Sequence, residues 1–115
     1  MTITLHGIKA CDTMKKARAW LDAHGVAHNF HDYKAVGIDR ATLERWSGMV
    51  GWETLLNRAG TTFRKLPDAD RADLSQAKAI ALMLAAPSMI KRPVLDTGSA
   101  LIVGFKPETY AAAFR

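Results

Sequence analysis

The chain has 115 residues, 49% of them hydrophobic, and one cysteine. This length suffices for one hydrophobic core and is short for two, so we expect one domain over residues 1–115. A lone cysteine cannot form an internal disulfide, which argues against a secreted, disulfide-stapled scaffold. The net charge of +5 is scattered in short basic pairs among acidic residues, a pattern that favours a small anionic ligand over nucleic acid.

The sequence carries no targeting or membrane signal. Its first residues lack the basic start, apolar run and small-residue cleavage site of a secretion signal. The longest apolar run, residues 79–86, is far shorter than the roughly 20 residues that span a bilayer. We therefore expect a soluble protein of the cytoplasm that does not contact membranes.

The first third of the chain predicts a strand, a helix and a second strand. Residues 2–6 alternate polar and apolar side chains, and residues 26–33 return to that alternation. Between them, residues 12–24 repeat apolar side chains at helical spacing, and Gly25 follows as a helix terminator. A unit of this kind predicts a parallel pair of strands with a right-handed crossover.

The middle of the chain predicts helices. Asp39 is placed to cap a helix, and residues 52–58 form a second short helical pattern. Asp73 followed by Gln76 resembles a capping box at the start of a longer helix, which Pro87 ends. This part of the chain is therefore predicted to be a helical insertion.

The last third predicts a β-hairpin and a closing helix. Residues 93–95 and 100–103 are apolar runs separated by a turn sequence, and residues 108–114 form a short helical pattern. The order is βαβ, a helical insertion at about residues 39–87, and then ββα. This is the α/β arrangement of a thioredoxin-like fold with extra helices between its halves.

Cys11 stands where the first strand pattern turns into a helix. The first backbone N–H groups of a helix lack intrahelical partners and stabilise an anion, and Lys9, Lys15 and Lys16 add positive charge. A cysteine so placed is a candidate nucleophile, because the thiolate is the reactive form. The alternative is a small buried residue that fills a gap. Thr13 is close enough to cap the helix or to bind a substrate oxygen.

Arg92 and Pro93 open the first strand of the hairpin. A proline at this position lacks a donor and can take the cis form, which fixes the backbone where another group must approach. Arg92 offers a planar charged fork suited to an oxyanion or a carboxylate. The alternative is a simple connection with a surface arginine.

The four histidines do not predict a metal site. His28 and His31 are three residues apart on a predicted strand, so their side chains point to opposite faces. No cysteine or carboxylate stands at ligand spacing beside them. His6, at the end of a strand, is expected at the surface.

Four segments, residues 7–17, 55–66, 90–95 and 103–106, together resemble the ArsC-like family. This family includes glutaredoxin-linked arsenate reductases, the YffB group of glutathione-dependent thiol reductases and the Spx transcriptional regulators. The resemblance covers nearly the whole chain and is strongest to the YffB group. These motifs are specific for the family and not for one activity within it.

The resemblance implies roles for particular residues. Cys11 falls on the catalytic cysteine, and Arg92 falls on the arginine that precedes the cis-proline, here Pro93, and binds the oxyanion. Arg58 and Lys106 lie in the regions of two further substrate-binding arginines. The full set of three arginines is not evident, so arsenate is not the expected natural substrate.

The enzyme hypothesis requires a thiol from outside the chain. Without a second cysteine, glutathione, with glutaredoxin as a further partner, would resolve an adduct on Cys11, and Arg92 or Lys9 would hold a glutathione carboxylate. We expect no bound cofactor or metal and a small anionic or disulfide substrate. The alternative is a regulator that binds RNA polymerase without turnover, as Spx does; methionine at position 14 argues against the CxxC switch of Spx proteins.

Overall fold

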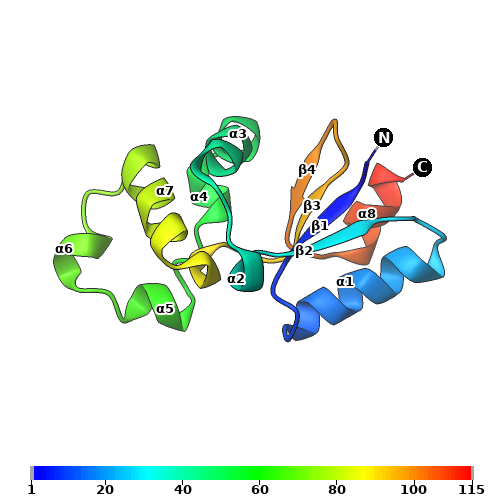
Figure 1. Cartoon of the computed structure of the whole chain (residues 1–115), viewed down its shortest axis with the longest axis horizontal. Helices are drawn as coiled ribbons and strands as arrows, with labels where there is room; N and C mark the ends of the chain where they lie inside the picture. The colour runs from blue at the N-terminus through cyan, green and yellow to red at the C-terminus, as the bar shows by residue number, and fades with distance from the viewer. Residues whose placement is uncertain (1, 115) are drawn as a thin grey trace. The chain divides into compact units, whose positions relative to one another are not determined.

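A computed structural model describes residues 2–114 and contains a mixed four-stranded sheet in the order β2-β1-β3-β4 (Figure 1). The central strand β1 runs parallel to β2 and antiparallel to β3, and β4 pairs antiparallel with β3. The strands are β1 (Thr4–Gly7), β2 (Asn29–Asp32), β3 (Val94–Asp96) and β4 (Leu101–Val103). The predicted thioredoxin-like α/β fold is confirmed.

The chain divides into two compact units, the second of which is the segment Val36–Lys91. The first unit joins the residues up to Ala35 to those from Arg92 onward, and it holds the sheet, α1 (Asp12–Ala23) and α8 (Pro107–Ala113). The second unit contains the segment predicted as a helical insertion. That the whole chain acts as one domain stays a prediction.

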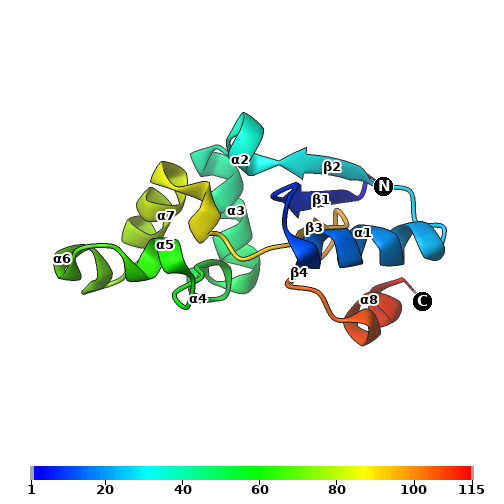
Figure 2. The same ribbon diagram turned by 90° about the horizontal axis from the view of Figure 1, so that it is seen from below.

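The core of the first unit lies between one face of the sheet and the helices α1 and α8. Met14, Ala17 and Leu21 recur every three or four residues along α1 and are buried together with Leu5 and Leu95 of the sheet. Tyr110 of α8 belongs to the same cluster, and Figure 2 shows α8 running beside α1. Because successive side chains of a strand point to opposite faces, the neighbours of Leu5 in β1 face the other side of the sheet.

Gly7, the last residue of β1, lies directly against Met14. A Cβ at this glycine would stand 2.6 Å from the Met14 Cε and closer still to its Sδ. Met14 is 1% exposed, so its side chain cannot make room without moving against its neighbours in the core. The contact explains why the strand ends in glycine just before the Cys11 loop.

Replacing Gly7 with alanine is expected to lower the free energy of unfolding by about 1–3 kcal/mol, because the core around Met14 becomes overpacked. The matched control is Gly48→Ala in α3 (Arg40–Val50), where an added Cβ meets nothing within 4 Å. That change should raise stability by about 0.5–1 kcal/mol through helix propensity. Urea denaturation measures both variants, and a Gly7→Ala protein as stable as the parent would contradict the expectation.

The second unit is helical, as the sequence predicts. The Asp39 carboxylate accepts a hydrogen bond from the Thr42 N–H at 2.8 Å, which confirms the predicted cap. Leu43 and Trp46 of α3 are fully buried. The other elements of this unit are α4 (Trp52–Leu55), α5 (Thr61–Arg64), α6 (Asp68–Arg71), α7 (Gln76–Ala85) and the 3-10 helix η1 (Pro87–Met89).

The predicted capping box at Asp73 and Gln76 is wrong. Ser75 caps α7, and its hydroxyl accepts from the Lys78 N–H at 3.3 Å. Asp73 has a φ of 52° and belongs to the preceding turn. α7 begins directly after Ser75 because the Ser75 hydroxyl accepts from a backbone N–H of the first turn, which has no partner within the helix.

The predicted helix over residues 52–58 is wrong beyond Leu55. Leu56 is extended and forms an antiparallel bridge with Ile90. The Lys91 N–H donates to the Leu55 carbonyl at 2.7 Å, and the Asn57 N–H donates to the Met89 carbonyl at 2.7 Å. Pairing with a distant segment thus replaces the next helical turn.

The strand predicted over residues 26–33 is shorter in the structure, because Tyr33 begins the short helix α2 (Tyr33–Val36). Within residues 2–114, no helix has the length and apolar character needed to cross a membrane.

Candidate functional site

Cys11 is the N-cap residue of α1 and is partly exposed. Its backbone is extended (φ −88°, ψ 130°), and its carbonyl accepts from the Lys15 N–H at 3.1 Å. The sulfur makes no regular capping hydrogen bond, yet it faces the N–H groups of Thr13 and Met14. Thr13 lies inside the helix and does not cap α1, so of its two expected roles only contact with a substrate oxygen stays a prediction.

Arg92 and Pro93 lie immediately before β3 and are joined by a cis peptide bond. The Pro93 carbonyl accepts from the Gly104 N–H at 2.8 Å, which ties this bend to the end of β4. Because β3 is the neighbour of β1, the Arg92 guanidinium reaches the Cys11 sulfur. The structure therefore brings the two principal predicted residues together.

The surroundings of Cys11 favour its thiolate. Partial burial raises the pKa of the thiol, but the Met14 N–H, the Arg92 guanidinium and the Thr13 N–H together outweigh it and lower the pKa below the ordinary value. Helix N–H groups and an adjacent arginine are two of the means by which proteins activate cysteine. The surroundings of Cys11 thus shift the thiol toward its reactive, anionic form.

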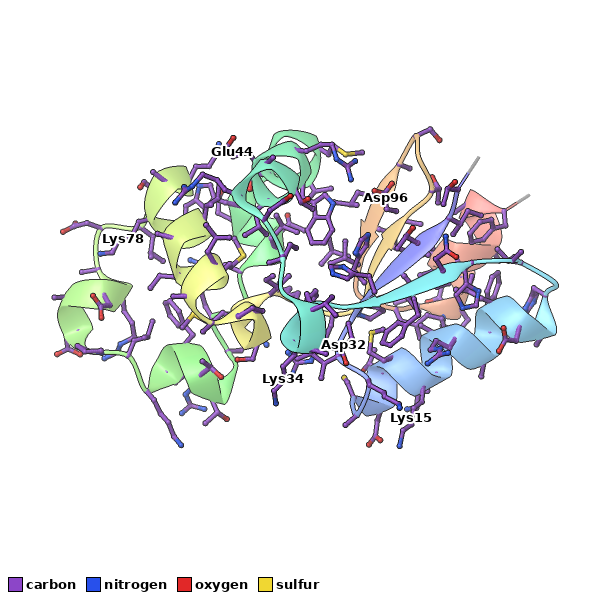
Figure 3. The ribbon with its side chains drawn as sticks, viewed as in Figure 1. Lys15, Asp32, Lys34, Glu44, Lys78 and Asp96 are labelled. Atoms are coloured by element: carbon purple, nitrogen blue, oxygen red, sulfur yellow. The ribbon has the colours of Figure 1, made fainter. Side chains whose placement is uncertain are left out.

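Two further residues of this region, Asp32 and Tyr33, were not predicted. The Asp32 carboxylate accepts from the Lys9 N–H at 3.2 Å, which ties the Cys11 loop to the end of β2. It also accepts from the N–H groups of Lys34 at 3.0 Å and Ala35 at 3.1 Å. Despite an opposing effect of burial, these bonds lower the pKa of Asp32. Figure 3 shows Asp32 and Lys34 at the end of the sheet where α1 begins.

Tyr33 is fully buried, and its hydroxyl interacts with the Arg92 guanidinium. Burial raises the pKa of Tyr33, so this phenol is neutral at physiological pH. The sequence signal for both residues was an aspartate at the end of a strand pattern, since aspartate is common at the start of a turn.

His6, expected at the surface, is half-buried and is paired with a histidine of the neighbouring strand. Its Nδ1 lies 2.8 Å from the Nδ1 of His31, its register partner on β2, so one ring donates and the other accepts. The rings meet edge to face with centroids 5.0 Å apart. Residues 2–114 contain no group of three or more side chains from His, Cys, Asp and Glu that could hold a metal.

The remaining predicted residues are three exposed side chains. Lys9 is exposed on the Cys11 loop, and Lys106, also exposed, is the N-cap of α8. Lys106 lines a surface pocket of about 230 Å³ with Gly104, Phe105 and Thr109. Arg58 is exposed in the second unit, after α4, and its role at the Cys11 site stays a prediction.

Comparison with known proteins gives a consistent relationship. Residues 6–113 match the ArsC family. The solved structure of a YFFB protein has a TM-score of 0.96 and 69% sequence identity, and the match covers 99% of this chain and 100% of that one. The solution structure of an arsenate reductase (ArsC) related protein from Brucella melitensis has a TM-score of 0.79 and 58% identity, with 100% and 96% covered.

A regulator is also similar to this chain. The global transcriptional regulator Spx of Streptococcus mutans is 29% identical over 112 residues, which cover 96% of this chain and 81% of Spx. The family resemblance in the sequence, including the YffB group, is confirmed.

Proposed function

Since this chain belongs to the ArsC family, we propose that it is a glutathione-dependent thiol oxidoreductase with Cys11 as its nucleophile. The observation that carries the proposal is the contact of the Cys11 sulfur with helix N–H groups and the Arg92 guanidinium, which favours the thiolate. Similarity to an arsenate reductase-related protein supports thiol-based reduction as the class of reaction. The proposal includes a location in the cytoplasm, where glutathione is kept reduced.

The proposed reaction is thiol–disulfide exchange, with two steps at Cys11 and a third between glutathione and the released product. The Cys11 thiolate attacks one sulfur of a substrate disulfide, forms a mixed disulfide with it, and expels the other sulfur as a thiolate that takes a proton from water. A glutathione thiolate then attacks the mixed disulfide at the substrate sulfur. This second step releases Cys11 as a thiolate and leaves the substrate sulfur joined to glutathione. A second glutathione thiolate then attacks the glutathione sulfur of that disulfide and releases the substrate as a thiolate, so two glutathione thiols supply the two electrons and end as oxidised glutathione.

The chain composition supports an external resolving thiol. Cys11 is the single cysteine, so no second thiol of the chain is available to release the adduct. Arg92 would hold a carboxylate of glutathione or an oxyanion next to the sulfur, with Pro93, Thr13 and Lys9 around it. Glutathione is then a co-substrate rather than a bound cofactor, and glutaredoxin is a further candidate partner.

The similarity to Spx favours one alternative, a regulator that binds RNA polymerase without turnover. In that case the site around Arg92 would serve an interface. A protein that recovers polymerase stoichiometrically in a pull-down and shows no reductase activity would support the alternative.

The proposed function is tested by the rate of Cys11 alkylation with iodoacetamide across pH 4–10, with mass spectrometry to confirm single-site modification. Iodoacetamide reacts with the thiolate, so the rate rises through the thiol pKa. We expect a midpoint well below about 8.5, the ordinary value for a free cysteine. A midpoint at or above that value, or no labelling of the folded protein, would contradict an activated nucleophile.

A further inference from the structure

The turn after β2 connects the two residues of the candidate site through Tyr33. Resting on the proposed function, we infer that Tyr33 is a positioning residue, whose buried hydroxyl holds the Arg92 guanidinium against the Cys11 sulfur. Tyr33 itself does not take part in bond making or breaking.

Tyr33 is held rigidly in place. It begins α2 directly after β2, and its side chain is fully buried. The carboxylate of the preceding residue, Asp32, accepts from the N–H groups of Lys34 and Ala35 and so fixes the turn that carries Tyr33. The same carboxylate accepts from the Lys9 N–H in the loop before Cys11. The Asp32 side chain therefore holds both the loop before Cys11 and the turn that carries Tyr33.

The chemistry of the contact between Tyr33 and Arg92 gives the tyrosine hydroxyl a defined role. A guanidinium carries donors only, so the Tyr33 oxygen accepts the hydrogen bond from Arg92. The group that pairs with an arginine inside a protein is commonly a carboxylate. A carboxylate at the position of the Tyr33 hydroxyl would neutralise the positive charge that stabilises the Cys11 thiolate. A neutral phenol orients the guanidinium and leaves its charge available to the sulfur. Burial keeps Tyr33 neutral, because it raises the pKa of the hydroxyl.

The test is the pH dependence of Cys11 alkylation in the Tyr33→Phe variant of the full chain. Phenylalanine retains the buried ring and removes only the oxygen that accepts from Arg92. We expect the alkylation midpoint to rise by about half a pH unit or more, which is about a threefold loss of thiolate below the midpoint. Urea denaturation verifies that the variant is folded.

The chain contains a matched control in Tyr110→Phe. Tyr110 is also fully buried in the first unit, and its hydroxyl has no hydrogen-bond partner among the described residues. Removing this oxygen should leave the alkylation midpoint unchanged. A shift of equal size in both variants would overturn the inference, since it would show a general effect of losing a buried hydroxyl.

A double variant shows whether Tyr33 acts through Arg92. In an Arg92→Ala background, Tyr33→Phe should cause no further shift of the midpoint, because the positioned group is already absent. Additive shifts would overturn the inference. If the unmodified protein has a midpoint near the ordinary cysteine value, the proposed function itself fails. If that midpoint is low and Tyr33→Phe does not raise it, only the role of Tyr33 fails.

Discussion

The Cys11→Ser variant is expected to lose all thiol-dependent turnover and to fall to the uncatalysed background. A serine hydroxyl is far less acidic than a thiol and cannot form the mixed disulfide that links the two exchange steps. No other residue can replace it, because Cys11 is the single cysteine of the chain. The measurement is a glutathione-coupled assay that follows disulfide reduction through glutathione reductase and NADPH.

The loss should not result from unfolding. Cys11 is partly exposed, and its sulfur makes no regular capping hydrogen bond. Serine is among the preferred N-cap residues, so the free energy of unfolding should be unchanged or slightly higher. An active Cys11→Ser protein would refute the proposed mechanism, and a variant that is inactive because it is unfolded would show a structural role instead.

Truncating Arg92 to alanine is expected to have the second largest effect. A charge-assisted hydrogen bond contributes about 1.5–3 kcal/mol, so kcat/KM for an anionic substrate or for glutathione should fall about ten- to hundredfold. The alkylation midpoint of Cys11 should also rise, because the guanidinium is one of the groups that lower the pKa of the thiol. Steady-state kinetics at several glutathione concentrations and the alkylation profile measure the two effects separately.

Two variants make this result specific. Arg18→Ala removes one positive charge from the same unit, but Arg18 lies over the Phe30 ring, 4.6 Å from its centroid, and should leave both measurements unchanged. Arg92→Lys keeps the charge and loses the planar fork, so it should restore only part of the binding. Equal losses in Arg18→Ala and Arg92→Ala would mean that net charge, and not the position of Arg92, governs the reaction.

Local signals predicted most of the elements correctly. The apolar spacing that leads up to Gly25 predicted α1, and Asp39 predicted the start of α3. Both depend on side chains and backbone groups within a few residues, where spacing and capping preferences act directly. The same local signals placed Cys11 at a helix start and Pro93 at the start of a strand.

Where these local signals failed, pairing between segments distant in the sequence determines the structure. Leu56 leaves its helix because it bridges to Ile90. His6 pairs with His31, a contact that the sequence does not indicate, because strand register places the two residues side by side. In each case a partner more than twenty residues away provides a contact that the local pattern does not contain, and tertiary contacts of this kind routinely override local propensity.

The sequence alone determined the family, and it singled out Cys11 and Arg92 as the candidate site, because these depend on motifs at the ends of strands and helices. The tertiary structure decided how they are held. Asp32 and Tyr33 contact the Cys11 loop and Arg92 only because β2, β1 and β3 are neighbours in one sheet. Strand order is set by burial of one shared apolar face, and that property belongs to the assembled sheet and not to any single segment.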